Sequence, residues 1–199
     1  MKKPIVLLFS MIVLTALLAG CHSEVDPGAV SPLGAIEVQA SDNCPHGLNA
    51  GTRLSTFSTK YNADNKDRTS NIILASEAID GTVLKPGEEF SFNETIGSTT
   101  RRRGYKKATV YSGGQKTKNY GGGVCQVSST LFNAADAAGM EIVERHSHSL
   151  NVDYIEKGRD ATTSHRGKLD LKFANRYGVP VQINVKNSDG TISVEFQVK

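Results

Sequence analysis

The sequence predicts an α+β fold with a single domain, in which a cysteine-bearing helix packs on a mainly antiparallel β-sheet. The first observation is a run rich in Ala from Cys125 to Ala138, whose apolar residues recur at helical spacing. The second is a series of short runs after Gly139 in which apolar and polar residues alternate. A helix followed by several short alternating strands is typical of α+β domains, so the two observations together give the fold class.

Two strands and a second helix are predicted before this helix. RLSTFSTKY at 53–61 predicts the first strand, and NIILASEAID at 71–80 predicts a helix with Ser70 as its N-cap and Gly81 at its end. A Lys-Pro-Gly turn follows, and EFSFNETIG at 89–97 predicts a strand with both phenylalanines on one face.

The remaining chain divides into a polar segment, the cysteine-bearing helix and the strands. Residues 97–123 are polar and rich in Gly, and they predict one short strand at 108–111. The helix predicted at 125–138 has a buried stripe of Val127, Leu131, Ala134, Ala135 and Ala138. MEIVER, SLNVDYI, KLDLKFAN, PVQINVKN and ISVEFQV predict strands, with a hairpin turn at 187–190 between the last two.

The chain begins with a predicted bacterial lipoprotein signal. Two lysines precede a short apolar run that ends in LAGC and is too short to span a bilayer comfortably. Residues 1–20 are therefore predicted to be a signal peptide, and Cys21 to be the lipidated residue that anchors the protein to a membrane. Residues 21–52, rich in Ser, Pro, Gly and Asp, predict a flexible tether, and residues 53–199 the folded domain. These features predict an exported protein, lipid-anchored at the outer face of the cytoplasmic membrane or at the periplasmic face of a membrane.

The charge balance argues against nucleic acid as a partner. The formal net charge is +3, and removal of the signal peptide lowers it by two lysines, whereas nucleic-acid-binding domains usually carry a strong basic excess. The one dense basic run, Arg101–Arg103, is interpreted as a solvated loop. No metal or cofactor is predicted, because the CPH and HSH stretches each supply too few ligands for a zinc site. The oligomeric state is left open.

Cys125 has three interpretations. At the first position or N-cap of a helix, its sulfur would lie among unpaired N–H groups and the positive end of the helix dipole, which stabilise a thiolate. The glycines before it let the backbone turn tightly and leave the sulfur uncovered. A disulfide with Cys44 and a small buried structural residue are the alternatives, because export permits disulfides and cysteines are often buried.

A cysteine nucleophile also needs a base, and often a third group that orients the base. His146 and His148 lie directly after the predicted strand MEIVER and share one face of an extended segment. Asp160 and Asp170 are the candidate acids. Papain-like and transglutaminase-like folds use the same chain order of cysteine, histidine and aspartate, which is an analogy of order alone.

Several motifs taken together resemble the VanW family. They are STFST, DRTSNI, LKPGEEFSFNETIG, RRGYKKATVY, GGGVCQVSSTLFNAA, GMEIVERHSHS, GRDATT and LDLKFAN, and they follow one another from Arg53 towards the C-terminus. The resemblance covers nearly the whole predicted domain. It implies an exported or membrane-anchored bacterial protein that acts in cell-wall (peptidoglycan) metabolism or glycopeptide resistance, without naming a reaction.

The resemblance also implies which residues belong to the site. The family pattern GGG-x-CQ-x-SST falls on Gly121, Gly122, Gly123, Cys125, Gln126, Ser128, Ser129 and Thr130. The pattern ER-x-x-HS falls on Glu144, Arg145, His148 and Ser149, and the DAT element falls on Asp160, Ala161 and Thr162. This favours His148 over His146 as the base, and His165, which matches no family histidine, is given no role.

The leading hypothesis is a cell-surface cysteine enzyme that acts on peptidoglycan or its peptides. Cys125 would attack an amide carbonyl, His148 would transfer the proton, and Asp160 or Asp170 would orient the imidazole. Gln126 or backbone N–H groups at the helix start would stabilise the oxyanion. Transfer of the acyl group to water or to an amine would make the protein a hydrolase or a transpeptidase.

Two further hypotheses need no chemistry at Cys125. In the first, the protein is a non-catalytic module that binds cell-wall fragments or glycopeptide in a groove formed with Tyr105, Tyr111 and Tyr120. In the second, it is a scaffold lipoprotein that recruits cell-wall enzymes. Loss of turnover with retention of binding in Cys125→Ser would separate the enzyme from the binding module.

Overall fold

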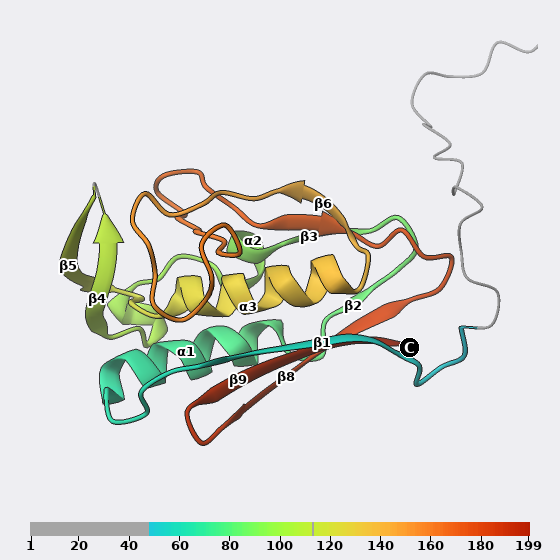
Figure 1. Ribbon diagram of the computed structural model, residues 1–199, viewed down its shortest axis with the longest axis horizontal. Helices are drawn as coiled ribbons and strands as arrows, with labels where there is room; N and C mark the ends of the chain where they lie inside the picture. Colours follow the sequence, from blue (N-terminus) through green and yellow to red (C-terminus); the bar gives the residue numbers. More distant parts are fainter. Residues whose placement is uncertain (1–47, 113) are drawn as a thin grey trace, which may run out of the picture. The chain divides into compact units, whose positions relative to one another are not determined.

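The computed structural model of the protein describes residues 48–112 and 114–199 (Figure 1). The predicted signal peptide, Cys21, Cys44 and nearly all of the predicted tether lie outside these residues. Within the described part of the chain, no helix is both long enough and apolar enough to cross a membrane.

The described residues form helices and antiparallel strands, which confirms the predicted α+β class. The helices are α1 (Lys66–Ile79), α2 (Phe92–Ile96) and α3 (Val124–Ala137), with a 3₁₀ turn at Arg101–Arg103. The strands are β1 (Arg53–Lys60), β2 (Val83–Leu84), β3 (Glu89–Ser91), β4 (Lys107–Ser112), β5 (Gln115–Tyr120), β6 (Glu141–Glu144), β7 (Lys172–Ala174), β8 (Val181–Ser188) and β9 (Thr191–Val198).

The strands form two sheets and a separate hairpin instead of one sheet. The first sheet has the order β1-β9-β8-β2, the second has the order β3-β7-β6, and β4 pairs only with β5. The cysteine-bearing helix α3 packs against β1 and β9 of the first sheet and against β6 of the second, with α1 beside it (Figure 1). Helix α3 is therefore held by elements from both sheets.

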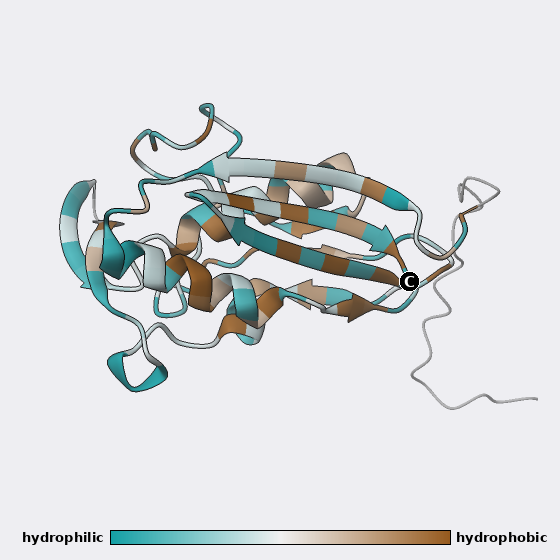
Figure 2. Cartoon of the chain, turned by 90° about the horizontal axis from the view of Figure 1, so that it is seen from below, coloured by the Kyte–Doolittle hydropathy of each residue, from teal (hydrophilic) through white to brown (hydrophobic). Residues whose placement is uncertain are grey.

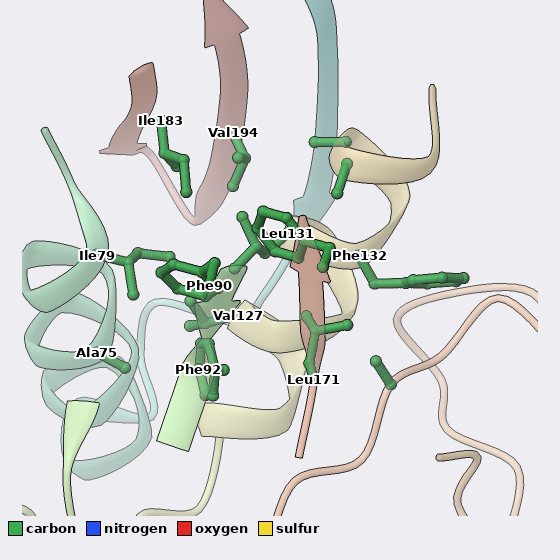
Figure 3. Packing of buried hydrophobic residues seen from close by; sticks show 14 of the residues in the cluster. Ala75, Ile79, Phe90, Phe92, Val127, Leu131, Phe132, Leu171, Ile183 and Val194 are labelled. Atoms are coloured by element: carbon green, nitrogen blue, oxygen red, sulfur yellow. The ribbon is translucent and has the colours of Figure 1, made fainter. Parts of the chain in front are cut away.

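The main core forms where α1 and α3 face the first sheet (Figure 3). Val127 and Leu131 of α3 meet Ile79 of α1 and the strand residues Ile183 and Val194, and all five are fully buried. Complete burial of one such side chain contributes about 1.5–3 kcal/mol. This packing sets where α3 begins, and so where its first residues lie.

The C-terminal hairpin follows the sequence prediction closely. Residues of β9 alternate between buried and half-buried positions, and Figure 2 shows the same alternation of hydropathy along the long strands of the first sheet. Between β8 and β9, Asp189 and Gly190 both have positive φ, 48° and 72°, as a tight two-residue hairpin turn requires.

Several predicted boundaries were wrong. Helix α1 begins at Lys66, where the side chain of Asn65 accepts a hydrogen bond from the Arg68 N–H at 3.4 Å, and not after Ser70. Its first turn is exposed and polar, so hydrophobic spacing alone places the start too late. The strand predicted at 89–97 ends at Ser91, whose side chain caps α2 by accepting from the Glu94 N–H at 3.1 Å.

Two other segments also differ from the prediction. SLNVDYI at 149–155 forms no strand, although apolar and polar residues alternate in it. Strand β5 was missed because QKTKNY has no apolar face, and its first five residues are exposed. The β4–β5 hairpin is correspondingly hydrophilic in Figure 2.

Candidate active site

Cys125 lies in the first turn of α3, as the second residue of the helix and one position further in than predicted. The helix starts after Gly123, whose φ of 106° lies in a region that residues with a side chain rarely adopt. Backbone N–H groups and the helix dipole in this first turn favour negative charge on the sulfur. Among the described residues the thiol is free and half-buried. Cys44, its partner in the disulfide alternative, lies outside these residues.

The glycine-rich loop before Cys125 lies directly against β4. A Cβ atom on Gly122 would come within 2.5 Å of the carbonyl oxygen of Thr109 and 2.7 Å of the carbonyl carbon of Ala108. Asn71 of α1 holds the loop from the other side, because its amide donates to the carbonyl oxygens of Gly122 and Lys106, both at 3.0 Å. The turn into α3 is therefore fixed by steric fit and by hydrogen bonds.

His148 and Asp160 form a pair beside the sulfur. The Oδ2 atom of Asp160 accepts from Nδ1 and from the backbone N–H of His148, each at 2.6 Å. The His148 side chain is 5% exposed and that of Asp160 is 9% exposed. The imidazole also forms a hydrogen bond with the Cys125 side chain. Because Nδ1 is bonded to Asp160, Nε2 is the ring nitrogen that faces Cys125. Cys125, His148 and Asp160 therefore lie in series, as a nucleophile, its base and an orienting acid would.

The charges of these three groups support one another. Burial acts to raise the pKa of Cys125, but the hydrogen bond and charge of His148 outweigh it, so the pKa of the thiol is lowered. Burial acts to lower the pKa of His148, but the hydrogen bonds and charges of Cys125 and Asp160 outweigh it, so that pKa is raised. For Asp160, burial is outweighed by hydrogen bonds from His148, and its pKa is lowered. The site favours a thiolate–imidazolium pair.

Arg145 fixes Asp160 from the other side. Its Nε and Nη2 atoms donate to the carbonyl oxygen of Asp160 at 2.7 and 2.5 Å, and Nη2 lies 3.5 Å from Oδ1 of the same residue. The guanidinium also lies over the ring of Phe132 in α3, 4.8 Å from its centre. Arg145, which the family pattern assigned to the site, thus contacts the acid of the pair and positions it.

Ser128 and Ser129 tie α3 to the segment that carries Asp160. The Ser128 hydroxyl donates to the carbonyl oxygen of Ala161 at 2.7 Å, and the Ser129 hydroxyl accepts from the Ala161 N–H at 2.9 Å. Both serines are fully buried. Their hydroxyls bond to the backbone of Ala161 and do not face the space in front of Cys125. These bonds therefore help to set the distance between the cysteine and the acid.

Gln126 is directed away from the sulfur. Its amide nitrogen donates to the Thr59 hydroxyl at 2.9 Å and to the Lys60 carbonyl oxygen at 2.8 Å, and its Oε1 atom accepts from Arg68 at 2.6 Å. The residue is 1% exposed. Since both amide hydrogens are engaged, the structure does not place Gln126 as the oxyanion donor suggested from the sequence, and backbone N–H groups at the start of α3 are the remaining candidates.

The sequence left two choices open, His146 or His148 as the base and Asp160 or Asp170 as the acid, and the structure places only one residue of each pair beside the sulfur. Nε2 of His146 pairs with Glu144 at 2.9 Å, so His146 is engaged outside the cysteine site. Asp170 accepts from the Ser91 hydroxyl at 2.6 Å and from the Asn93 N–H at 2.9 Å, which stabilises the start of α2. His148 and Asp160 are therefore the histidine and acid brought to the sulfur.

Cys125 and His148 line a cleft of about 1130 Å³. Opposite the sulfur lie the Thr162 hydroxyl at 3.8 Å and the Thr163 carbonyl oxygen at 3.5 Å. Arg68 and Tyr154 also line the cleft. The family pattern had already pointed to Thr162, whereas Arg68, Tyr154 and Thr163 were given no role in the sequence analysis. Their signals were weak: Arg68 falls inside the motif DRTSNI and Thr163 inside GRDATT.

The predicted tyrosine groove is only partly present. Tyr120 lines the cleft, whereas Tyr105 is 2% exposed and belongs to the core. Tyr105 is therefore excluded as a binding platform. In the described part of the chain, no group of three or more His, Cys, Asp or Glu side chains lies close enough together to hold a metal ion.

Comparison with known proteins gives the family. A family model described as VanW like protein matches residues 67–197. The chain belongs to the VanW-like family. The matched span contains Cys125, His148 and Asp160, so these three residues belong to the VanW-like domain itself.

Two relatives extend this comparison. The uncharacterized protein YoaR of Bacillus subtilis (strain 168) is 46% identical over 142 residues, which cover 71% of this chain and 46% of YoaR. The vancomycin B-type resistance protein VanW of Enterococcus faecalis (strain ATCC 700802 / V583) is 34% identical over 133 residues, 64% of this chain and 48% of that protein. The chain thus spans about half the length of these curated relatives, and no solved structure matches it.

Proposed function

We propose that this VanW-like protein is a cysteine-dependent acyl-transfer enzyme that acts on peptidoglycan or its peptides. The observation that supports the chemistry is the series Cys125–His148–Asp160, in which each partner stabilises the charged form of the next. A structural cysteine needs no buried imidazole held by a carboxylate at 2.6 Å. Buried charges are costly unless they are paired, so this arrangement favours a reactive thiol over a packing residue.

The proposed reaction has two steps. In the first, the Cys125 thiolate attacks the carbonyl carbon of an amide, a carbon–sulfur bond forms, and the carbon–nitrogen bond breaks as His148 gives its proton to the leaving amine. In the second, water or an amine attacks the thioester while His148 takes up its proton, and the carbon–sulfur bond breaks to restore the thiolate. Backbone N–H groups at the start of α3 stabilise the oxyanion in both steps.

The cell-wall substrate is supported by the family. One relative bears the name vancomycin B-type resistance protein, and the motif resemblance implies a role in cell-wall metabolism or glycopeptide resistance. The N-terminal sequence supports the location, because a short apolar segment ending in LAGC predicts lipidation at Cys21. Fractionation of cells tests this anchor: we expect the unaltered chain in the membrane fraction and Cys21→Ser outside it.

The enzymatic proposal is tested by incubating the full chain with purified peptidoglycan fragments and following products by mass spectrometry. Turnover is expected for the unaltered protein and for Cys44→Ser, and it should be abolished in Cys125→Ser and His148→Ala. A covalent mass increase on the peptide that contains Cys125 would identify the thioester. If Cys125→Ser binds the fragments as well as the unaltered protein and neither forms products, the binding module replaces the enzyme.

A further inference from the structure

The cleft in front of Cys125 is strongly basic, although the chain as a whole is nearly neutral. Its lining contains the cations Lys60, Arg68, Arg101, Lys116 and Arg166, and one acid, Asp153. The formal net charge of the chain is only +3, so this excess is a local property. The thiolate and the imidazolium cancel each other's charge, and the cleft therefore remains positive when the site is ready to react.

Among these cations, Arg68 lies directly against the start of α3. A Cβ atom on Gly123, two residues before the cysteine, would lie 3.0 Å from Cγ of Arg68. Nη2 of Arg68 donates to Oε1 of Gln126 at 2.6 Å, and Gln126 is buried and fixed by its own hydrogen bonds to β1. The guanidinium is therefore held in place, which favours a positioning role over that of a mobile surface charge.

The charge of Arg68 acts on two tyrosines that line the cleft. Burial raises the pKa of Tyr61, and the charge of Arg68 acts against this rise. Burial also raises the pKa of Tyr154, and Arg68 again acts in the opposite direction. Since both tyrosines line the cleft, a group bound in the cleft beside either of them would lie within the field of this guanidinium.

We infer that the acyl substrate carries a carboxylate close to the carbonyl carbon that Cys125 attacks, and that Arg68 is the main residue that binds it. This inference rests on the proposed function, because it names the class of acyl group which the same site accepts. A guanidinium fits a carboxylate through two parallel N–H···O hydrogen bonds. The four other cations raise the local concentration of an anionic substrate.

The test compares two alkylating reagents that differ in charge. The protein is used with Cys125 as its only cysteine (Cys21→Ser, Cys44→Ser). The measured quantity is the rate of labelling by anionic iodoacetate divided by the rate of labelling by neutral iodoacetamide. We expect this ratio to exceed that of N-acetylcysteine amide severalfold. Arg68→Gln should lower it severalfold, because the substitution removes one positive charge from the cleft that attracts the anionic reagent. The excess should also shrink as salt is added, because ions screen these charges.

Two sets of variants keep the result independent of folding. Lys116→Gln and Arg166→Gln remove exposed cations of the cleft, and each should lower the ratio without unfolding the chain. Arg53→Gln is the matched control, because Arg53 is an exposed residue on β1 that pairs with Glu195 at 3.6 Å, and it should leave the ratio unchanged. A ratio equal to that of the model thiol, or one unaffected by all three cleft variants, would overturn the inference.

The kind of anion is tested by protection. Acetate and inorganic phosphate at equal ionic strength are compared for their ability to slow labelling of Cys125 by iodoacetamide. Protection by acetate supports a carboxylate, and protection by phosphate alone would overturn that choice. If peptidoglycan fragments are not converted but the reagent ratio is high, the enzyme proposal fails while the anion site stands. If they are converted and the ratio is ordinary, the charge inference alone fails.

Discussion

Asp160→Asn tests the site most directly, because it removes one negative charge and almost no volume. Oδ2 of Asp160 accepts two hydrogen bonds from His148, each at 2.6 Å, and an asparagine oxygen can accept them only without the charge. A hydrogen bond to a charged group contributes about 1.5–3 kcal/mol. At about 1.4 kcal/mol per tenfold change, we expect the alkylation rate of Cys125 near neutral pH to fall about tenfold to a hundredfold.

The pH profile gives the sign of this effect. The charge of Asp160 helps to raise the pKa of His148, and His148 in turn lowers the pKa of Cys125. Asp160→Asn should therefore lower the pKa of the imidazole and raise that of the thiol, so that rapid labelling begins at a higher pH. The assay is the rate of iodoacetamide labelling against pH, measured by mass spectrometry with Cys125 as the only cysteine.

Asp170→Asn is the matched control for this substitution. Asp170 is as buried as Asp160, with 6% of its surface exposed in both cases, and it also accepts short hydrogen bonds, but from Ser91 and the start of α2. We expect Asp170→Asn to lower stability and to leave the labelling profile unchanged. The reasoning is refuted if Asp160→Asn leaves the profile where it was, or if both variants shift it equally.

Two further predictions concern stability. A Cβ on Gly122 would overlap the backbone of β4, so Gly122→Ala should lower the melting temperature and cost about 1–3 kcal/mol. The pKa of Asp160 is lower in the folded than in the unfolded chain. Its carboxylate therefore stabilises the fold fully above the unfolded pKa, and this stabilisation is lost as the pH falls through the folded pKa. Acid titration of unfolding should show this loss in the unaltered chain and not in Asp160→Asn.

The parts of the fold that the sequence predicted are those with strong local signals. Helix α3 combines a glycine start with apolar residues at helical spacing, and the β8–β9 hairpin combines strict alternation with a turn that needs positive φ at Asp189 and Gly190. Strand β5 was missed because a hairpin exposed to solvent needs no apolar alternation. The strand predicted at 149–155 was wrong because its alternation matches no partner strand, and pairing is decided by tertiary structure.

The sequence predicted which types of residue form the site but not all of the contacts between them. Cys125 and the histidines were visible as groups able to do chemistry, and the family pattern selected His148. The choice between Asp160 and Asp170 could not be made from the sequence, because it depends on which acid the irregular segment after β6 brings back to α3. The role of Arg68 could not be predicted for the same reason, although it lies in the motif DRTSNI, since it reaches the cleft from α1.

The SST triplet after the cysteine gains a physical meaning from the structure. Residues three and four apart on a helix share a face, so Cys125, Ser128 and Ser129 face the same side of α3. On that side the sulfur meets Thr162 and the two hydroxyls meet Ala161, and Ala161 follows the acid directly. One face of α3 thus carries both the nucleophile and the two serines that hold the segment of the acid. A shift of the serines by one residue would place them on a different face from Cys125. The GGG-x-CQ-x-SST spacing is therefore a geometric requirement of the site as well as a signature of the family.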